Sequence, residues 1–276
     1  IYTVSGDNLI GAADAGKPIQ GTGKPGATVS LTLGTATVTA VVDGSGNWSY
    51  TLTPADITAM GEGPETIRAT QTDVGGNTSP EAIQAVTVDT VKPTGLTVAP
   101  VAADDKVNAA EAASTLITGT AEANATITLT LGGNTVTTTA DASGNWSYAL
   151  TPADITAMGQ GPETISLTQA DAAGNVSDPV TRDISIDTTA PSAPVVNAVA
   201  LDDVVNAAEK TAGITLTGSN EAGASVKINL GGADIDLGTV AGTSWSYTLD
   251  ATAVAALGEG AKTLTATQTD AGGNSS

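Results

Sequence analysis

The chain has 276 residues and a formal net charge of −20, from 9 Lys and Arg against 29 Asp and Glu, and it contains neither Cys nor His. Such a surface is a poor partner for nucleic acid or anionic membranes, because phosphate binding needs clustered Lys and Arg, and no apolar run approaches the ~20 residues of a membrane span. Without Cys and His there is no disulfide, zinc–thiolate site or Ser–His or Cys–His nucleophile, so we do not expect an enzyme.

The sequence repeats with a period of about 100 residues, which indicates whole domains in tandem, since solenoid repeats run to about 20–50 residues. Trp48, Trp146 and Trp245 each open a Trp-Ser-Tyr triplet, and Gly46–Gly61 matches Gly144–Gly159 at every position but one. We therefore predict three domains. Their boundaries are 1–89 for a domain that lacks its first segment, 90–187 for a complete domain, and 188–276 for a domain that lacks its last strand. The chain is expected to be a piece of a longer protein.

The complete second repeat reads as a series of short strands. Val- and Thr-rich runs with period-2 alternation are separated by Gly, Asn and Asp clusters. Seven such strands with close turns predict an all-β fold, a seven-stranded immunoglobulin-like β-sandwich in each repeat. The predicted strands are Leu96–Pro100, Thr115–Ala121, Thr126–Leu131, Thr135–Ala140, Trp146–Leu150, Thr164–Ala170 and Val180–Ile186.

A short helical turn is predicted before the sixth strand. Thr151 suits an N-cap, Pro152 the first helical position and Asp154 the third, and Gly159 supplies a stop. The first repeat has the same pattern at Thr53–Gly61, and the third has a looser version around Asp250–Gly258. Alternation places Trp146 and Tyr148 on one face. We interpret the helical turn as a cap at the end of the sandwich and the Trp as core rather than a ligand platform.

Three motifs carry a resemblance to bacterial Ig-like repeats. These are Gly-Asn-Trp-Ser-Tyr in the first two repeats, the Asp-x-x-Gly-Asn turns at 73–77, 171–175 and 270–274, and the Asp-Thr-x-x-Pro linkers at 89–93 and 187–191. Such repeats build the stalks of giant non-fimbrial adhesins exported by type I secretion, including the giant Salmonella adhesin and biofilm-associated proteins. The resemblance implies a secreted protein of the bacterial cell surface, involved in virulence, whose other regions contact host cells or glycans. It also implies Ca²⁺ between the repeats.

The acidic residues gather in loops that the fold brings to the domain junctions. In a seven-stranded sandwich the A–B loop lies at the downstream pole, beside the linker, and the B–C, D–E and F–G loops lie at the upstream pole. The first junction therefore collects A–B, linker and F–G residues that we predict as metal ligands: Asp7, Asn8, Asp14, Asp89, Asp171 and Asn175. The second junction collects the equivalent set: Asp104, Asp105, Glu111, Asp187, Asp270 and Asn274. Glu122 and Glu221, in the B–C loops, join these sets.

Converging carboxylates repel one another unless a cation lies among them, and a ligand set of oxygens alone suits Ca²⁺. The alternative is that these are ordinary turn sequences and solvated loops. We therefore predict a stalk segment, a monomeric rod whose neighbouring repeats are held by junction Ca²⁺. Two rival interpretations remain. In one, each repeat binds a glycan or a host protein; in the other, the chain is a metal-independent acidic spacer.

Overall fold

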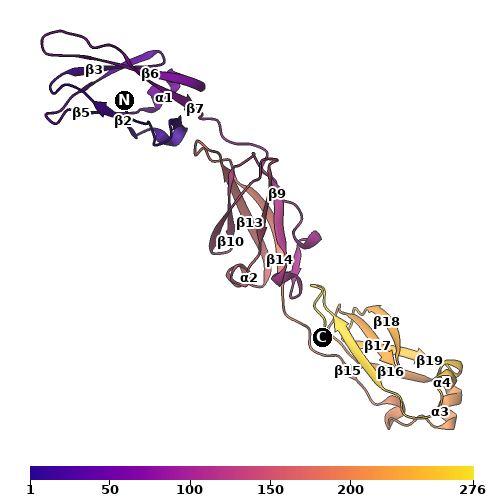
Figure 1. Cartoon of the computed structure of the whole chain (residues 1–276). Coiled ribbons are helices and arrows are strands. Elements are labelled where there is room, and N and C mark those ends of the chain that lie inside the picture. The colour runs from indigo at the N-terminus through magenta and orange to yellow at the C-terminus, as the bar shows by residue number, and fades with distance from the viewer.

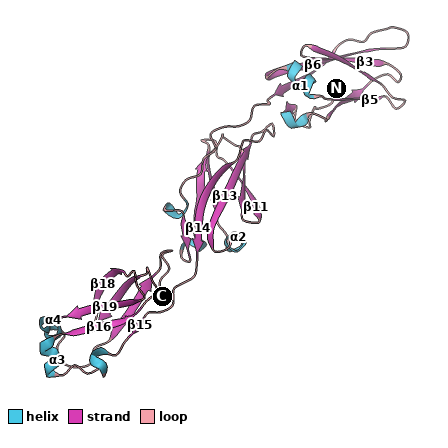
Figure 2. Cartoon of the chain, turned by 180° about the vertical axis from the view of Figure 1, so that it is seen from behind, coloured by secondary structure: helices cyan, strands magenta, loops and turns pink.

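The computed structural model describes all 276 residues, and shows three β-sandwiches strung along an extended chain (Figure 1). Each sandwich has its own hydrophobic core, and no strand pairing joins one sandwich to another. The second view shows that helices contribute only short turns at the ends of the sandwiches (Figure 2). The predicted all-β, immunoglobulin-like fold is confirmed. No helix has the length and apolar character needed to cross a membrane.

The first domain packs a five-stranded sheet, in the order β1-β7-β6-β3-β4, against the pair β2-β5. Strand β1 runs parallel to β7, and the remaining pairs are antiparallel. Its elements are β1 (Leu9–Ile10), a 3₁₀ turn (Ala12–Asp14), β2 (Pro18–Thr22), β3 (Thr28–Leu33), β4 (Ala36–Val41), β5 (Asn47–Thr51), α1 (Pro54–Met60), β6 (Gly63–Thr72) and β7 (Ala82–Val88).

The second domain repeats this topology, with the sheet β11-β10-β13-β14-β8 facing the pair β12-β9. Its elements are 3₁₀ turns at Val101–Ala103 and Glu111–Ala113, β8 (Lys106–Asn108), β9 (Leu116–Thr120), β10 (Thr126–Leu131), β11 (Asn134–Thr139), β12 (Asn145–Ala149), α2 (Pro152–Met158), β13 (Gly161–Ala170) and β14 (Val180–Asp187).

The third domain has two three-stranded sheets, β15-β16-β19 and β18-β17-β20. Its elements are β15 (Val195–Val196), a 3₁₀ turn (Val199–Leu201), α3 (Ala207–Ala212), β16 (Ile214–Ser219), β17 (Ser225–Leu230), β18 (Ala233–Thr239), β19 (Ser244–Leu249), α4 (Ala251–Ala256) and β20 (Leu264–Thr269).

The first segment of the second domain differs from the prediction, because it divides its hydrogen bonds between the two sheets. Residues 96–100 form no regular strand, although the amides of Thr97 and Ala99 donate to the carbonyls of Thr120 and Thr118. The backbone then turns through positive φ at Ala102 and crosses to the other sheet, where β8 runs parallel to β14. The predicted A–B loop therefore contains a strand.

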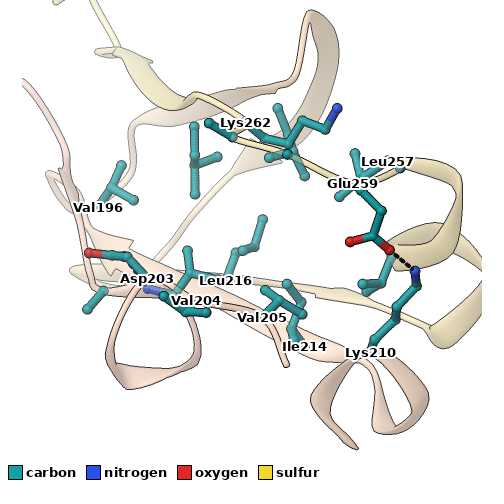
Figure 3. Close-up of a pocket in the computed structure, with 18 of the residues that line it drawn as sticks. Val196, Asp203, Val204, Val205, Lys210, Ile214, Leu216, Leu257, Glu259 and Lys262 are labelled. Atoms are coloured by element: carbon teal, nitrogen blue, oxygen red, sulfur yellow. Dashed lines mark hydrogen bonds and ion pairs between the residues drawn. The ribbon is translucent and has the colours of Figure 1, made fainter. Parts of the chain in front are cut away.

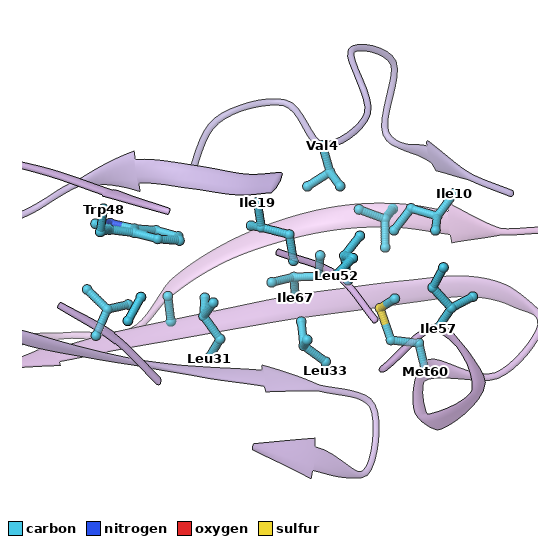
Figure 4. Packing of buried hydrophobic residues seen from close by; sticks show 14 of the residues in the cluster. Val4, Ile10, Ile19, Leu31, Leu33, Trp48, Leu52, Ile57, Met60 and Ile67 are labelled. Carbon is cyan, nitrogen blue, oxygen red and sulfur yellow. The ribbon is translucent and has the colours of Figure 1, made fainter. Parts of the chain in front are cut away.

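The tryptophans are core residues, as predicted. Trp48, Trp146 and Trp245 are at most 5% exposed, and Trp48 lies among the aliphatic side chains of the first core (Figure 4). A glycine faces each ring across the neighbouring strand, and a Cβ at Gly21 would lie 2.5 Å from a ring carbon of Trp48. The indole therefore packs directly against the main chain of the glycine, and a side chain at that position would clash with the ring.

The predicted helical caps are confirmed in the first two domains. In α2, the Thr151 hydroxyl accepts a hydrogen bond from the Asp154 amide, and Asp154 accepts hydrogen bonds from the Thr151 amide at 2.9 Å and the Tyr148 hydroxyl at 2.8 Å. Ile155 and Met158 are buried in the second core, so the turn closes one end of the sandwich. Thr53, Asp56 and Tyr50 make the same contacts at α1.

The Asp154 cap predicts a pH dependence of stability. Burial raises the pKa of this carboxyl, but the hydrogen bonds from Thr151 and Tyr148 outweigh burial and hold the pKa below its usual range. A lowered folded-state pKa contributes stability above the unfolded-state pKa of about 3.9, and that contribution is lost as the pH falls through the folded value. Asp154→Asn is expected to cost about 1–2 kcal/mol at pH 7 and much less at pH 2, measured by thermal unfolding. An equal loss at both pH values would contradict this account.

Candidate functional site

Two asparagines, Asn175 and Asn274, join neighbouring domains, and we call them the docking asparagines. The Asn175 amide nitrogen donates to the main-chain carbonyl of the linker residue Asp89 at 2.8 Å, and its Oδ1 accepts from the Ala12 amide at 3.2 Å. Asn274 repeats both contacts at the second junction, with the Asp187 carbonyl at 2.9 Å and the Ala109 amide at 2.8 Å. Each F–G loop thus contacts the A–B loop of the preceding domain.

The equivalent residue of the first domain shows that this contact depends on a neighbouring domain. The Asn77 side chain bonds only to Asp73 of its own loop, and it is exposed. Asn175 and Asn274 keep the same bond to Asp171 and Asp270, but both are only 5% exposed. The same F–G turn therefore forms with and without a docked domain. Its asparagine side chain is buried only where a domain precedes it.

The linkers are held at both ends by side chains that the sequence analysis missed. At the start of the first linker, the Thr90 amide donates to the Glu62 carboxylate at 3.0 Å. At the start of the second, the Thr188 amide donates to the Gln160 side-chain oxygen at 2.9 Å. At the end of the first linker, the buried Gln169 donates to the Thr94 carbonyl at 3.0 Å, and at the end of the second, Gln268 donates to the Ser192 carbonyl. A signal for these glutamines exists in the sequence, because Gln71, Gln169 and Gln268 each stand two residues before the F–G turn.

The contact between loops is close enough to restrict side-chain size. A Cβ at Gly11 would lie 2.2 Å from the main-chain oxygen of Ala173 in the second domain. At the next junction, a Cβ at Gly272 would lie 2.7 Å from the carboxylate of the linker residue Asp187. Lys106 adds a further contact there, donating to the Ala271 carbonyl at 3.2 Å. The junctions are therefore packed contacts and not flexible tethers.

Asp105 holds its own domain together instead of facing the junction. Its carboxylate receives two hydrogen bonds from the Arg182 guanidinium on β14, one of them at 2.6 Å, and that ion pair holds the pKa of Asp105 below its usual range. Its Oδ1 also accepts from the Val101 amide, as Asn8 does from Val4. A basic residue of the same domain therefore neutralises Asp105, and no cation from the junction is needed there.

The remaining predicted ligands of the A–B loops also bond within their loops. The buried Asp14 accepts from the Gly11 amide at 2.7 Å and pairs with Lys17 at 2.5 Å, and these contacts outweigh burial and lower its pKa. Glu111 accepts from the Asn108 amide. Asp7 and Asp104 each accept from the amide two residues later. No hydrogen bond or ion pair joins Glu122 or Glu221 to the preceding domain.

The carboxylates that remain beside each linker are one linker aspartate and one F–G aspartate. These pairs are Asp89 with Asp171 and Asp187 with Asp270. In each pair, the side-chain amide of the docking asparagine donates both to the main-chain carbonyl of the linker aspartate and to the carboxylate of the F–G aspartate. No three carboxylates of the chain come together in an arrangement that could hold a metal ion. The donors fit Ca²⁺ in kind, since all are oxygens. Main-chain carbonyls and water would have to complete a coordination shell.

Three sandwiches joined by docked F–G and A–B loops define a tandem immunoglobulin-like array. The chain belongs to the bacterial Ig domain family, whose family model matches residues 9–89 and 93–185. This confirms the family to which the sequence motifs pointed. No curated protein matches the chain.

Several solved structures are similar to this chain. One, from a Ca²⁺-stabilized adhesin that helps an Antarctic bacterium reach out and bind ice, is 30% identical over 100% of this chain and 70% of that chain, with a TM-score of 0.48. A second, from a 1.5-MDa bacterial ice-binding adhesin, is 25% identical over 99% of this chain and 92% of that one, with a TM-score of 0.44. An immunoglobulin-like domain of the M. primoryensis ice-binding adhesin is 35% identical over 33% of this chain and 93% of its own, with a TM-score of 0.26.

Proposed function

We propose that this chain is a stalk segment of a secreted bacterial surface adhesin, which holds a binding region away from the cell. The observation that carries the proposal is the docking asparagine, because the same two-sided contact occurs at both junctions. A linker anchored at both ends resists bending more than a free tether. The domains to which we assign this role are 1–89, 90–187 and 188–276. Neighbouring repeats are then the direct partners of each domain.

The second part of the proposal is that Ca²⁺ adds to this stiffness. The ligands would be Asp89 and Asp171 at the first junction, and Asp187 and Asp270 at the second, with the loop carbonyls. Bound Ca²⁺ would supply positive charge between carboxylates that otherwise repel. The support is the all-oxygen donor set, together with a net charge of −20 that leaves these carboxylates few basic neighbours.

Calcium is expected to raise the melting temperature of the chain, and a chelator at fixed ionic strength is expected to reverse the rise. Extracellular sites typically bind at about 10⁻⁴–10⁻³ M, and at ten times that dissociation constant each site adds roughly 1.4 kcal/mol. Mg²⁺ should do much less, because it requires stricter octahedral geometry. Differential scanning calorimetry measures all three conditions. Identical melting curves with Ca²⁺ and with chelator would remove calcium from the proposal and leave the docked junction intact.

Removal of one linker carboxylate distinguishes the contribution of Ca²⁺ to stiffness from that of the asparagine contact. In Ca²⁺, Asp187→Ala is expected to shorten the maximum dimension measured by small-angle scattering toward that of the chelated parent, without unfolding either sandwich. The docking contact uses the main-chain carbonyl of Asp187, which the substitution keeps. Asp202→Ala is the matched control, since Asp202 is an exposed A–B aspartate with no domain docked on it. If Asp187→Ala stays as long as the calcium-loaded parent, Asp187 is not a stiffening ligand.

A further inference from the structure

The A–B loop and the F–G turn meet at each junction, and one position on each side differs in size between the repeats. In the A–B loops of the first, second and third domains, this position holds Gly11, Asn108 and Asn206. In the F–G turns it holds Gly75, Ala173 and Gly272. The first junction therefore combines a glycine loop with an alanine turn, and the second combines an asparagine loop with a glycine turn.

The backbone of the first domain does not require a glycine at position 11. Gly11 has a φ of −94° and a ψ of 177°, an extended conformation that every residue can adopt. It stands at the N-cap of the turn Ala12–Asp14, where asparagine is a preferred residue because its side-chain oxygen accepts amide hydrogen bonds. Glycine provides no such oxygen.

Both sister domains have the asparagine cap. Asn108 accepts hydrogen bonds from two amides of its turn, at 3.0 and 3.1 Å. Asn206 does the same at the start of α3, whose Lys210 pairs with Glu259 (Figure 3). The first domain thus lacks a contact that this fold otherwise uses, and the reason for its glycine lies outside the domain.

That reason is the close approach of the second domain. A Cβ at Gly11 would lie 2.2 Å from the main-chain oxygen of Ala173 and 3.4 Å from its methyl carbon. The turn is held there by Asn175, which bonds to the Ala12 amide and to the Asp89 carbonyl. An asparagine at position 11 therefore does not fit while the turn stays docked as observed.

At the second junction the larger residue belongs to the A–B loop. The Asn108 side chain lies against the turn, since a Cβ at Gly273 would be 3.1 Å from its nitrogen. On the other side of the turn, a Cβ at Gly272 would lie 2.7 Å from a carboxylate oxygen of Asp187 and 2.9 Å from its Cβ. The φ of Gly272 is not positive, so the backbone itself would accept alanine. Because Asn108 blocks a shift of the turn away from Asp187, only glycine fits.

We propose that these two positions select which repeat can follow which. A turn with alanine docks only on a loop with glycine, and a loop with asparagine accepts only a turn with glycine. Specificity of this kind comes from a clash with the wrong partner. A second copy of residues 90–187 placed directly after the first would set Ala173 against Asn108 and would not dock. The other combinations fit, so the rule restricts the order of the repeats without fixing it, whether or not Ca²⁺ is bound.

The test creates the excluded pair at the first junction of the whole chain. Gly11→Asn should leave both adjoining sandwiches folded, because it supplies the cap that the sister domains have. Residual dipolar couplings of the strand amides, measured on isotopically labelled protein, fit one common alignment when two domains are docked. We expect Gly11→Asn to lose the common alignment of the first two domains, compared with the parent in the same buffer.

A second substitution separates selection from simple damage. Gly11→Asn combined with Ala173→Gly recreates the pair of the second junction and should regain the common alignment. Ala173→Gly alone should behave as the parent does. A first domain that was merely destabilised could not be rescued by a change in its neighbour. The proposal would be overturned if Gly11→Asn kept the common alignment, or if the double variant failed to regain it.

Discussion

Gly119→Ala is expected to destabilise the second domain by about 3 kcal/mol, the upper part of the usual range for overpacking. Gly119 faces Trp146 across the β9–β12 pair. A Cβ there would lie 2.0 Å from the main-chain oxygen of Thr97 and 2.8 Å from the Trp146 ring. Trp146 is only 3% exposed. Either the first segment of the domain detaches from β9 or the indole leaves its place in the core.

Hydrogen exchange distinguishes this effect from a general loss of stability. In Gly119→Ala, the amides of β9 and β12 should lose protection while those of the first and third domains keep it. Gly133→Ala is the control, because a Cβ at Gly133 meets no atom within 4 Å. Its effect should stay within about 0.5 kcal/mol. Equal protection of β9 and β12 in both variants would refute the steric account.

Asn175→Ala is expected to release the first junction while leaving both adjoining sandwiches folded. The substitution removes the side-chain partner of the Asp89 carbonyl and of the Ala12 amide at once. Loss of such a buried contact costs about 1–3 kcal/mol. Here it weakens the docking of the two domains and not the folding of either one. The two domains should then sample many relative orientations.

Spin labels measure this directly, since the chain contains no Cys. Val41→Cys places one label on the first domain and Leu116→Cys places one on the second, both at exposed positions. The distance distribution between them should be narrow in the parent and broad with Asn175→Ala. Asn77→Ala removes the same amide from the same turn, where it contacts no other domain, and should leave the distribution unchanged. A narrow distribution with Asn175→Ala would mean that other contacts hold the junction.

The parts of the fold that could be predicted from the sequence are those with local causes. The caps of α1 and α2 follow from a Thr, a Pro and an Asp within four residues, and the buried Trp follows from alternation along one strand. The crossing at Ala102 could not be predicted, because β8 exists only through its pairing with β14, much later in the chain. The sequence analysis predicted no helix at α3, although Asn206 and Glu209 form a capping box at its start.

For the candidate site, the direction of successive strands was enough to place the A–B loop of one domain beside the F–G loop of the next. The role of each side chain was not predictable in the same way. Asp104 and Asp105 are adjacent in the sequence, yet one folds back on its own turn and the other pairs with Arg182. That difference depends on distances between strands of the folded domain. Whether Asp89 and Asp187 bind Ca²⁺ stays a prediction.

The docking asparagines contact only main-chain atoms of the preceding domain and the linker. Every residue offers a carbonyl like that of Asp89, and every residue except proline offers an amide like that of Ala12. These hydrogen bonds therefore follow the path of the neighbour's backbone and do not depend on the side chains along it, except where the loops approach closely, as at Gly11. Copies whose surfaces have diverged still fit end to end. An array built in this way can gain or lose whole copies by duplication or deletion, and its reach then changes in fixed steps without any new interface.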